Sequence, residues 1–145
     1  RRFSFVKEWN KIKFIDDYAH HPIEIRSVLK AAKKITTGKV VVVHQPHRYS
    51  RVQYLFEGFC SCFNEADIVG ITDIFSAGEK PIKGITKEKL VQGLSDAGHK
   101  SAYVIEEEKE LKLFFEKHVK SGDLFICLGA GSISSWLNNL ITNYN

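Results

Sequence analysis

The sequence predicts one α/β domain, residues 1–145, built on a doubly wound and mainly parallel sheet. Strand-like and helix-like segments alternate from Val40 onward, which is the pattern of a parallel sheet with right-handed crossovers. The run 40–43 (VVVV) is uniformly apolar, as expected of a strand covered on both faces. The chain has 145 residues without an internal repeat or linker, enough for one core. We therefore expect a Rossmann-like sheet with helices on both faces.

An N-terminal β-hairpin is expected to precede this sheet. Residues 3–9 and 12–16 alternate apolar and polar positions around Asn10-Lys11, a spacing typical of two short strands joined by a turn. Pro22 then suits the first position of a helix that ends near Gly38. The apolar face of that helix consists of Ile25, Val28, Leu29, Ala32 and Ile35.

The remaining elements follow from apolar runs and helical stripes. The predicted strands are 39–44, 67–74, 101–105 and 123–129. Four helical stripes accompany them: Val52, Leu55, Phe56, Phe59 and Phe63; Leu90, Val91, Leu94 and Ala97; Leu111, Phe114, Phe115 and Val119; Ile133, Trp136, Leu137, Leu140 and Ile141. The Gly- and Lys-containing segment 75–84 reads as a loop.

Composition argues against several functional classes. The net charge of +4 is mild, and acidic residues are interspersed, so the charge balance gives no indication of nucleic acid binding. No apolar run reaches the roughly 18 residues of a membrane span, and we expect a cytoplasmic protein. Cys60, Cys62 and Cys127 lack the spacing of a disulfide framework or zinc site and are expected to be buried thiols. The chain contains no methionine and begins at Arg1, so we expect it to be a piece of a longer protein.

Four polar loops are expected to meet at one edge of the sheet. They are 16–22 (DDYAHHP), 44–51 (HQPHRYSR), 73–79 (DIFSAGE) and 129–132 (GAGS), and each follows a predicted strand. In a parallel sheet, ligands bind beyond the carboxyl ends of the strands, where such loops gather. The sequence therefore predicts one shared site at this rim.

Within these loops, Arg48 and Arg51 are candidates for anion binding. They are three residues apart where a helix is expected to begin, so a shared helix face would let them grip a carboxylate or phosphate. A solvated face or an ion pair with a neighbouring loop is the alternative. A nucleic-acid patch is less favoured because Phe56, Phe59 and Phe63 belong to a buried stripe.

Two other motifs are less specific. The glycines of 129–131 would let a backbone approach an anion at a helix start, but a simple tight turn explains them equally well. No phosphate-binding G-x-x-x-x-G-K-[ST] loop occurs, so most contacts to any nucleotide triphosphate would lie outside this chain. The histidines at 20, 21, 44 and 47 do not have metal-ligand spacing, and no metal site is expected. Asp17 is a candidate hook for a hydroxyl group.

Taken together, the motifs 16–22 (DDYAHHP), 45–51 (QPHRYSR), 77–79 (AGE) and 129–131 (GAG) resemble the C-terminal domain of the Mur ligases. The resemblance implies a three-domain ATP- and Mg²⁺-dependent enzyme of peptidoglycan precursor synthesis, of which this chain is the amino-acid-binding domain. Its N-terminal UDP-sugar domain and central ATPase domain would be the partners of this one. Such an enzyme would join L-alanine to UDP-N-acetylmuramate through an acyl phosphate, and the isolated domain would be inactive.

The resemblance also implies roles for particular residues. Arg2 and Asp17 would serve ATP, and Asp17 would lie at the ribose. The incoming amino acid and the substrate would be met by Tyr18, His20, His47, Arg48, Arg51, Gly129, Ala130 and Gly131. No catalytic residue is assigned within this domain alone. The alternatives are a related peptide ligase of cell-wall recycling, which shares the HHP element, and a stand-alone anion-binding α/β module.

Overall fold

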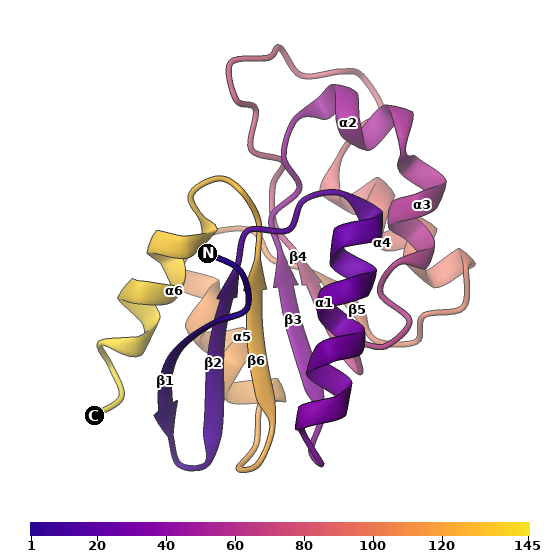
Figure 1. Cartoon of the computed structure of the whole chain (residues 1–145). Helices are drawn as coiled ribbons and strands as arrows, with labels where there is room; N and C mark the ends of the chain where they lie inside the picture. The colour runs from indigo at the N-terminus through magenta and orange to yellow at the C-terminus, as the bar shows by residue number, and fades with distance from the viewer.

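The computed structural model describes residues 1–145 and contains a six-stranded sheet in the order β1-β2-β6-β3-β4-β5 (Figure 1). Only β1 and β2 are antiparallel; the other neighbouring pairs are parallel. The strands are β1 (Ser4–Trp9), β2 (Ile12–Asp17), β3 (Val40–His44), β4 (Ile68–Ile71), β5 (Ala102–Val104) and β6 (Leu124–Leu128). The predicted α/β class and N-terminal hairpin are confirmed.

Two residues at positive φ form the hairpin turn. Asn10 and Lys11 have φ values of 51° and 62°, and the turn joins the paired residues Trp9 and Ile12. Two consecutive left-handed residues are typical of the tight turns whose twist matches that of antiparallel strands. In this hairpin, β2 is the strand that pairs with β6. The carboxyl end of β2 points the same way as the carboxyl ends of β3 and β4.

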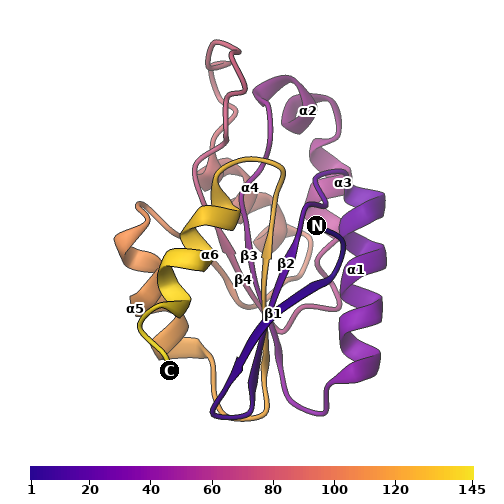
Figure 2. The same cartoon turned by 60° about the vertical axis from the view of Figure 1, so that its left-hand side comes forward.

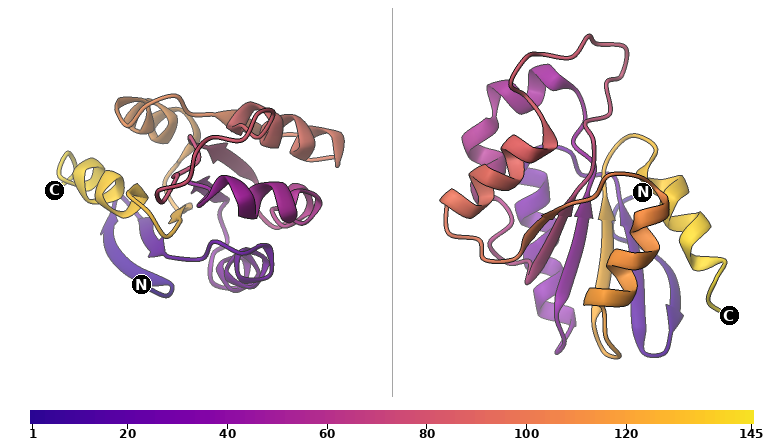
Figure 3. Two further views of the ribbon diagram at one scale, coloured as in Figure 1. Left: turned by 90° about the horizontal axis from the view of Figure 1, so that it is seen from above. Right: turned by 180° about the vertical axis from the view of Figure 1, so that it is seen from behind.

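Helices cover both faces of the sheet (Figures 2 and 3). Figure 2 shows α1 and α3 on one side of the strands, with α5 and α6 on the other. The helices are α1 (Pro22–Ile35), α2 (Tyr49–Tyr54), α3 (Phe56–Ser61), α4 (Lys87–Asp96), α5 (Lys109–His118) and α6 (Ile133–Ile141). No helix combines the length and apolarity that a bilayer span requires.

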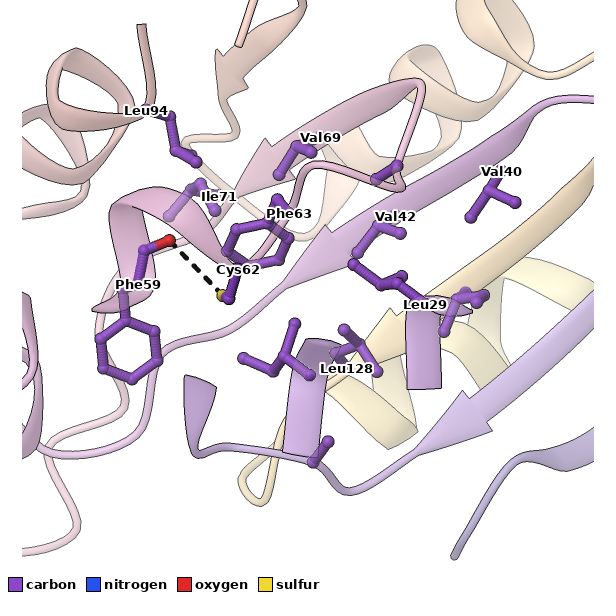
Figure 4. Close-up of a cluster of buried hydrophobic side chains, with 14 of the residues drawn as sticks. Leu29, Val40, Val42, Phe59, Cys62, Phe63, Val69, Ile71, Leu94 and Leu128 are labelled. Carbon is purple, nitrogen blue, oxygen red and sulfur yellow. Dashed lines mark hydrogen bonds between the residues drawn. The ribbon is translucent and has the colours of Figure 1, made fainter. Parts of the chain in front are cut away.

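The pleat of the strands divides the core into two layers. Val40 and Val42 of β3 pack into the layer under α1 and α3, whereas Val41 and Val43 pack into the layer under α5 and α6. All four valines are fully buried. Figure 4 shows the first layer, with Val42 beside Leu29 of α1. Burial on both faces explains why β3 has no alternation of apolar and polar residues.

Some element boundaries differ from the prediction. The single helix predicted from Val52 to Phe63 is broken at Leu55, whose φ of −111° and ψ of 25° are not helical. Val52 and Phe59 remain fully buried on the two sides of this bend. The strand predicted at 67–74 is confined to Ile68–Ile71, because the segment after it leaves the sheet to join the rim.

The strand order places a topological switch point between β3 and β6. The chain leaves β3 toward α2 and the first core layer, and leaves β6 toward α6 and the second layer. Neighbouring connections that diverge to opposite faces define a topological switch point, where α/β sheets bind ligands. The loops that follow β2, β3, β4 and β6 all start from this edge, which is uppermost in Figure 1.

Candidate functional site: a rim of four loops

Backbone hydrogen bonds hold the starts of the four loops side by side. The Gly129 amide donates to the Asp17 carbonyl at 3.0 Å, and the Gln45 amide donates to the Leu128 carbonyl at 2.9 Å. The Thr72 amide donates to the His44 carbonyl at 3.0 Å. The rim expected from the sequence is therefore one continuous feature, fixed by extension of the sheet ladder.

A cavity of about 210 Å³ opens where β2 meets the first turn of α1. We call it the α1 cavity. It brings Arg2, Asp17 and Tyr18 together, which the sequence analysis had selected. Its remaining lining residues are Ala19, Ile23, Glu24, Ser27 and Val28. Ile23 is largely exposed, so the cavity has an apolar wall beside a polar floor.

Asp17 organises the floor of the α1 cavity. Its carboxylate accepts the Phe3 amide at 2.6 Å and the Ala19 amide at 2.7 Å, and the residue is only 4% exposed. These bonds tie the N-terminal segment to the loop after β2. A carboxylate offers about four lone-pair sites, so two remain for a ligand.

The start of α1 is capped twice. The His21 ring accepts the Ile23 amide at 3.2 Å, while Glu24 accepts the backbone amides of His20 and His21 at 3.2 and 3.1 Å. This arrangement satisfies donors that a helix start leaves free. The pKa of Glu24 is lowered: its burial acts in the opposite direction and is outweighed by the two amides and by the charges of His20 and Arg2.

His47 and Arg51 form the centre of the rim with His20 and Phe75, and we call these four residues the histidine cluster. The Arg51 Nη1 donates to the His47 carbonyl at 2.8 Å and lies 3.1 Å from the His47 Nδ1. The rings of His20 and His47 are 5.9 Å apart. Burial, followed by the charge of Arg51, lowers the pKa of His47. A neutral His47 ring can accept the Arg51 proton at Nδ1, which leaves Nε2–H as a donor.

Arg48 departs from the sequence prediction. It precedes α2 as its N-cap residue, with φ of 74° and ψ of 129°, so the helical spacing used to put Arg48 and Arg51 on one face is wrong. The Arg48 amide donates to the Phe75 carbonyl at 2.8 Å, which holds the residue in this conformation. Such backbone angles are costly for a residue with a Cβ, and they concentrate at functional sites.

The loop after β4 contributes Phe75, which no family motif included, and Glu79, which belongs to the motif 77–79 but was assigned no role. The Phe75 ring stacks on His47, with centroids 5.4 Å apart and planes inclined by 12°. Glu79 accepts hydrogen bonds from the hydroxyl and the amide of Ser50 at the start of α2. An aromatic residue directly after the predicted strand 67–74, at the start of a predicted loop, was the available signal for Phe75.

The glycine turn after β6 packs tightly against the other loops. A Cβ on Gly129 would lie 3.0 Å from the Gln45 carbonyl oxygen, and one on Gly131 would lie 2.6 Å from Cγ of Phe75. Arg1 donates to the Gly129 carbonyl at 2.7 Å and pairs with Asp16 at 3.2 Å. Ala130, between the glycines, is half-buried. The turn is thus fixed by close approach of its backbone to β3 and to the loop after β4.

Gln45 joins the loops on the two sides of the switch point. Its Oε1 accepts the Ile133 amide at 3.1 Å, and its Nε2 donates to the Ser132 hydroxyl at 2.9 Å. The side chain therefore caps α6 from the loop after β3, and the residue is 4% exposed. Sequence reasoning included Gln45 in a motif but assigned it no role.

We expect Gln45→Leu to lower the free energy of unfolding of the chain by about 1–3 kcal/mol, because a buried amide and a hydroxyl lose their partner. Gln45→Glu keeps an acceptor at the start of α6 and should remain near the wild-type value. Urea denaturation measures both. Gln53→Leu, at an exposed position of α2, is the matched control. Equal stabilities of Gln45→Leu and Gln53→Leu would contradict the capping role.

The fold and the rim define a class of protein: an α/β domain whose strand ends carry a cluster of basic residues and, beside it, a cavity of about 210 Å³. The model of the family described as "Mur ligase, glutamate ligase domain" matches residues 1–131. The chain belongs to this family.

Relatives and solved structures agree with this assignment. The chain is 53% identical over 140 residues to a UDP-N-acetylmuramate–L-alanine ligase of Dinoroseobacter shibae and 51% identical to that of Paracoccus denitrificans. The alignments cover 97% of this chain but only about 30% of the length of each relative. The UDP-N-acetylmuramate-alanine ligase MurC of Thermotoga maritima superposes with a TM-score of 0.79 at 29% identity, covering 99% of this chain and 29% of that one.

A separately crystallised domain has the same fold. It comes from a Haemophilus ducreyi protein described as a UDP-N-acetylmuramate:L-alanyl-γ-D-glutamyl-meso-diaminopimelate ligase, and it covers 98% of both chains with a TM-score of 0.73 at 19% identity.

Proposed function

We propose that this chain is the C-terminal, amino-acid-binding domain of a three-domain ligase that joins L-alanine to UDP-N-acetylmuramate in peptidoglycan precursor synthesis. The observation that carries the proposal is the 53% identity, over 97% of the chain, to a ligase of that name. The rim supplies a chemical basis for it. An incoming amino acid needs an anchor for its carboxylate and space for its amine beside an activated carboxyl group.

The proposed carboxylate anchor is the guanidinium of Arg51. Its hydrogen bonds within the chain both use Nη1 and both go to His47. The other nitrogens of the fork remain for a ligand. A guanidinium fixed on one side and open on the other is suited to bidentate binding of a carboxylate. Arg48 adds a second positive charge near His47, and the hydrogen bond from its amide to the Phe75 carbonyl holds it at the start of α2.

The two histidines of the cluster would orient the amino group. The amine must keep its lone pair free for attack, so the ring that orients it has to accept an N–H. The His20 Nδ1 donates to the Tyr18 carbonyl at 3.1 Å, which leaves the His20 Nε2 as that acceptor. Burial and the charge of Arg51 lower the pKa of His47, which favours its neutral form. His20 lies between His47 and Tyr18, with ring centroids 5.9 and 5.2 Å away, respectively. The amine is then held without an additional imidazolium charge from His47 that would oppose its approach.

The α1 cavity is the proposed contact with the adenosine end of ATP. Tyr18 and Ile23 provide apolar surface, Asp17 retains lone pairs for a ribose hydroxyl, and Arg2 supplies positive charge. The chain has no phosphate-binding loop of the G-x-x-x-x-G-K-[ST] type. We therefore assign the triphosphate and Mg²⁺ mainly to the central domain. The backbone of Gly129, Ala130 and Gly131 closes the same rim on the substrate side.

The full-length gene product should form UDP-N-acetylmuramoyl-L-alanine and release ADP and phosphate only when ATP, Mg²⁺, UDP-N-acetylmuramate and L-alanine are all present. Product formation is measured by chromatography. Residues 1–145 alone should give no product under the same conditions, because the acyl phosphate would form at the central domain. A full-length protein that uses a tripeptide but rejects L-alanine would instead indicate the recycling ligase, and one that binds ligand without turnover would indicate a binding module.

A further inference from the structure

We propose that Phe75 is a specificity-determining residue whose ring forms the apolar wall for the side chain of the incoming amino acid. This inference rests on the proposed function and assigns a limit on substrate size to a residue outside the family motifs described above. It starts from the environment of the ring.

Phe75 is 36% exposed, although its neighbour Ile74 is buried in the first core layer. Single exposed apolar side chains are common on proteins, so the position of this ring, and not its exposure alone, is the informative observation. The ring lies in the histidine cluster, stacked on His47. Ligand sites combine a few convergent polar groups with apolar walls, and Phe75 is the hydrocarbon surface in this cluster.

The backbone around Phe75 keeps the ring in place. Its amide donates to the Pro46 carbonyl at 2.8 Å, and its carbonyl accepts the Arg48 amide at 2.8 Å. These two bonds flank His47, which forms an isolated parallel bridge with Phe75. The wall therefore has a fixed position relative to the residues proposed to hold the carboxylate and the amine.

The Phe75 ring also contacts Gly131, and this second contact limits its movement. A Cβ at this position would lie within 2.6–2.7 Å of two ring carbons of Phe75, so the ring occupies the space that a side chain would need. The ring thus spans from the loop after β3 to the glycine turn after β6. A wall held by His47 and the Gly131 backbone leaves little room to retreat from a larger substrate.

Contact with the Phe75 ring would discriminate between amino acids by the size of their side chains. The shared carboxylate and amine are held by Arg51 and the histidines, whereas a methyl group and a longer side chain differ only in apolar volume. One methylene changes discrimination by about 10- to 200-fold in a well-fitted apolar pocket. Removal of the ring should therefore alter the ratio between substrates more than the binding of ATP.

The test uses the full-length gene product with L-alanine, L-2-aminobutyrate and L-valine at saturating ATP and UDP-N-acetylmuramate. Phe75→Ala should shift the ratio of kcat/KM toward the larger amino acids, relative to L-alanine, by about tenfold or more. Phe75→Leu retains a shorter apolar side chain and should give a smaller shift in the same direction. KM for ATP should be unchanged. Tyr103→Ala removes an aromatic ring of similar exposure (41%) from the edge strand β5 and should leave the ratio unchanged.

Different results would contradict the specificity role of Phe75 and the proposed function of the chain. An equal fall in kcat/KM for every amino acid would mean that Phe75 only supports His47, which overturns the specificity role. Phe75→Leu carries the same test if circular dichroism shows that Phe75→Ala is unfolded. A wild-type protein without L-alanine-dependent product would contradict the proposed function itself, and the role of Phe75 with it.

Discussion

Replacing Arg51 by alanine should raise KM for L-alanine on the order of 100-fold in the full-length protein, with KM for ATP close to the wild-type value. The magnitude corresponds to the loss of charge-assisted hydrogen bonds to one carboxylate, about 1.5–3 kcal/mol. The prediction depends on geometry: Nη1 is held by His47 at 2.8 and 3.1 Å, so the rest of the fork is oriented before the ligand arrives. Initial rates at varied L-alanine measure the effect.

Two further variants separate charge from geometry at this position. Arg51→Lys keeps a positive charge but lacks the planar fork, so it should recover only part of the lost affinity. Arg26→Ala removes an exposed arginine of α1 that contacts only the Ser61 carbonyl, at 3.3 Å, and should behave as wild type. If Arg51→Ala required no more L-alanine than Arg26→Ala does, Arg51 would not be the carboxylate anchor.

The sequence was sufficient to predict the fold because the central strands β3, β4 and β6 are buried on both faces. A run such as Val40 to Val43 has few alternatives once helical stripes flank it. The hairpin turn at Asn10 and Lys11 was also predictable, because a turn of two residues between alternating strands is a local signal. The break at Leu55 was not, since its neighbours Val52 and Phe59 continue the helical stripe and remain buried on both sides.

The site was predictable as a set of loops but not as a set of contacts. Sheet geometry gathers the carboxyl ends of parallel strands, so Asp17, His47 and Gly129 could be expected at one rim. The partners that hold them come from distant parts of the chain. Gln45 meets Ser132 across 87 positions, and Phe75 meets His47 through a single bridge. Neither contact has a periodicity that a sequence pattern could reveal.

His44 offers a separate test of the core. The residue ends β3, is fully buried, and packs near the rings of Phe59 and Phe63, with centroids 5.9 and 5.5 Å away. Neither ring nitrogen has a hydrogen-bond partner. Burial lowers the pKa of His44 to about 3, with a smaller opposing effect from the Leu128 backbone and a further lowering by the charge of His20. The folded chain therefore keeps this ring neutral at pH values where the unfolded chain protonates it.

The consequence is a loss of stability in acid that His44→Leu should remove. The pKa of His44 is about 6.5 in the unfolded chain and about 3 in the folded one. Above pH 6.5 the ring is neutral in both states and does not lower the free energy of unfolding. Between pH 6.5 and pH 3 only the unfolded chain binds the proton, so the free energy of unfolding falls as the pH falls. At pH 4 this difference amounts to about 3 kcal/mol of unfolding free energy.

Urea denaturation of residues 1–145 between pH 4 and pH 7.5 should therefore give a shallower decline for His44→Leu than for the wild type. Val42→Ala, on the same strand and core face, removes no titratable group and should lower the whole curve without changing its slope. Parallel curves for His44→Leu and wild type would show that His44 is protonated equally in both states, which its burial without a partner argues against.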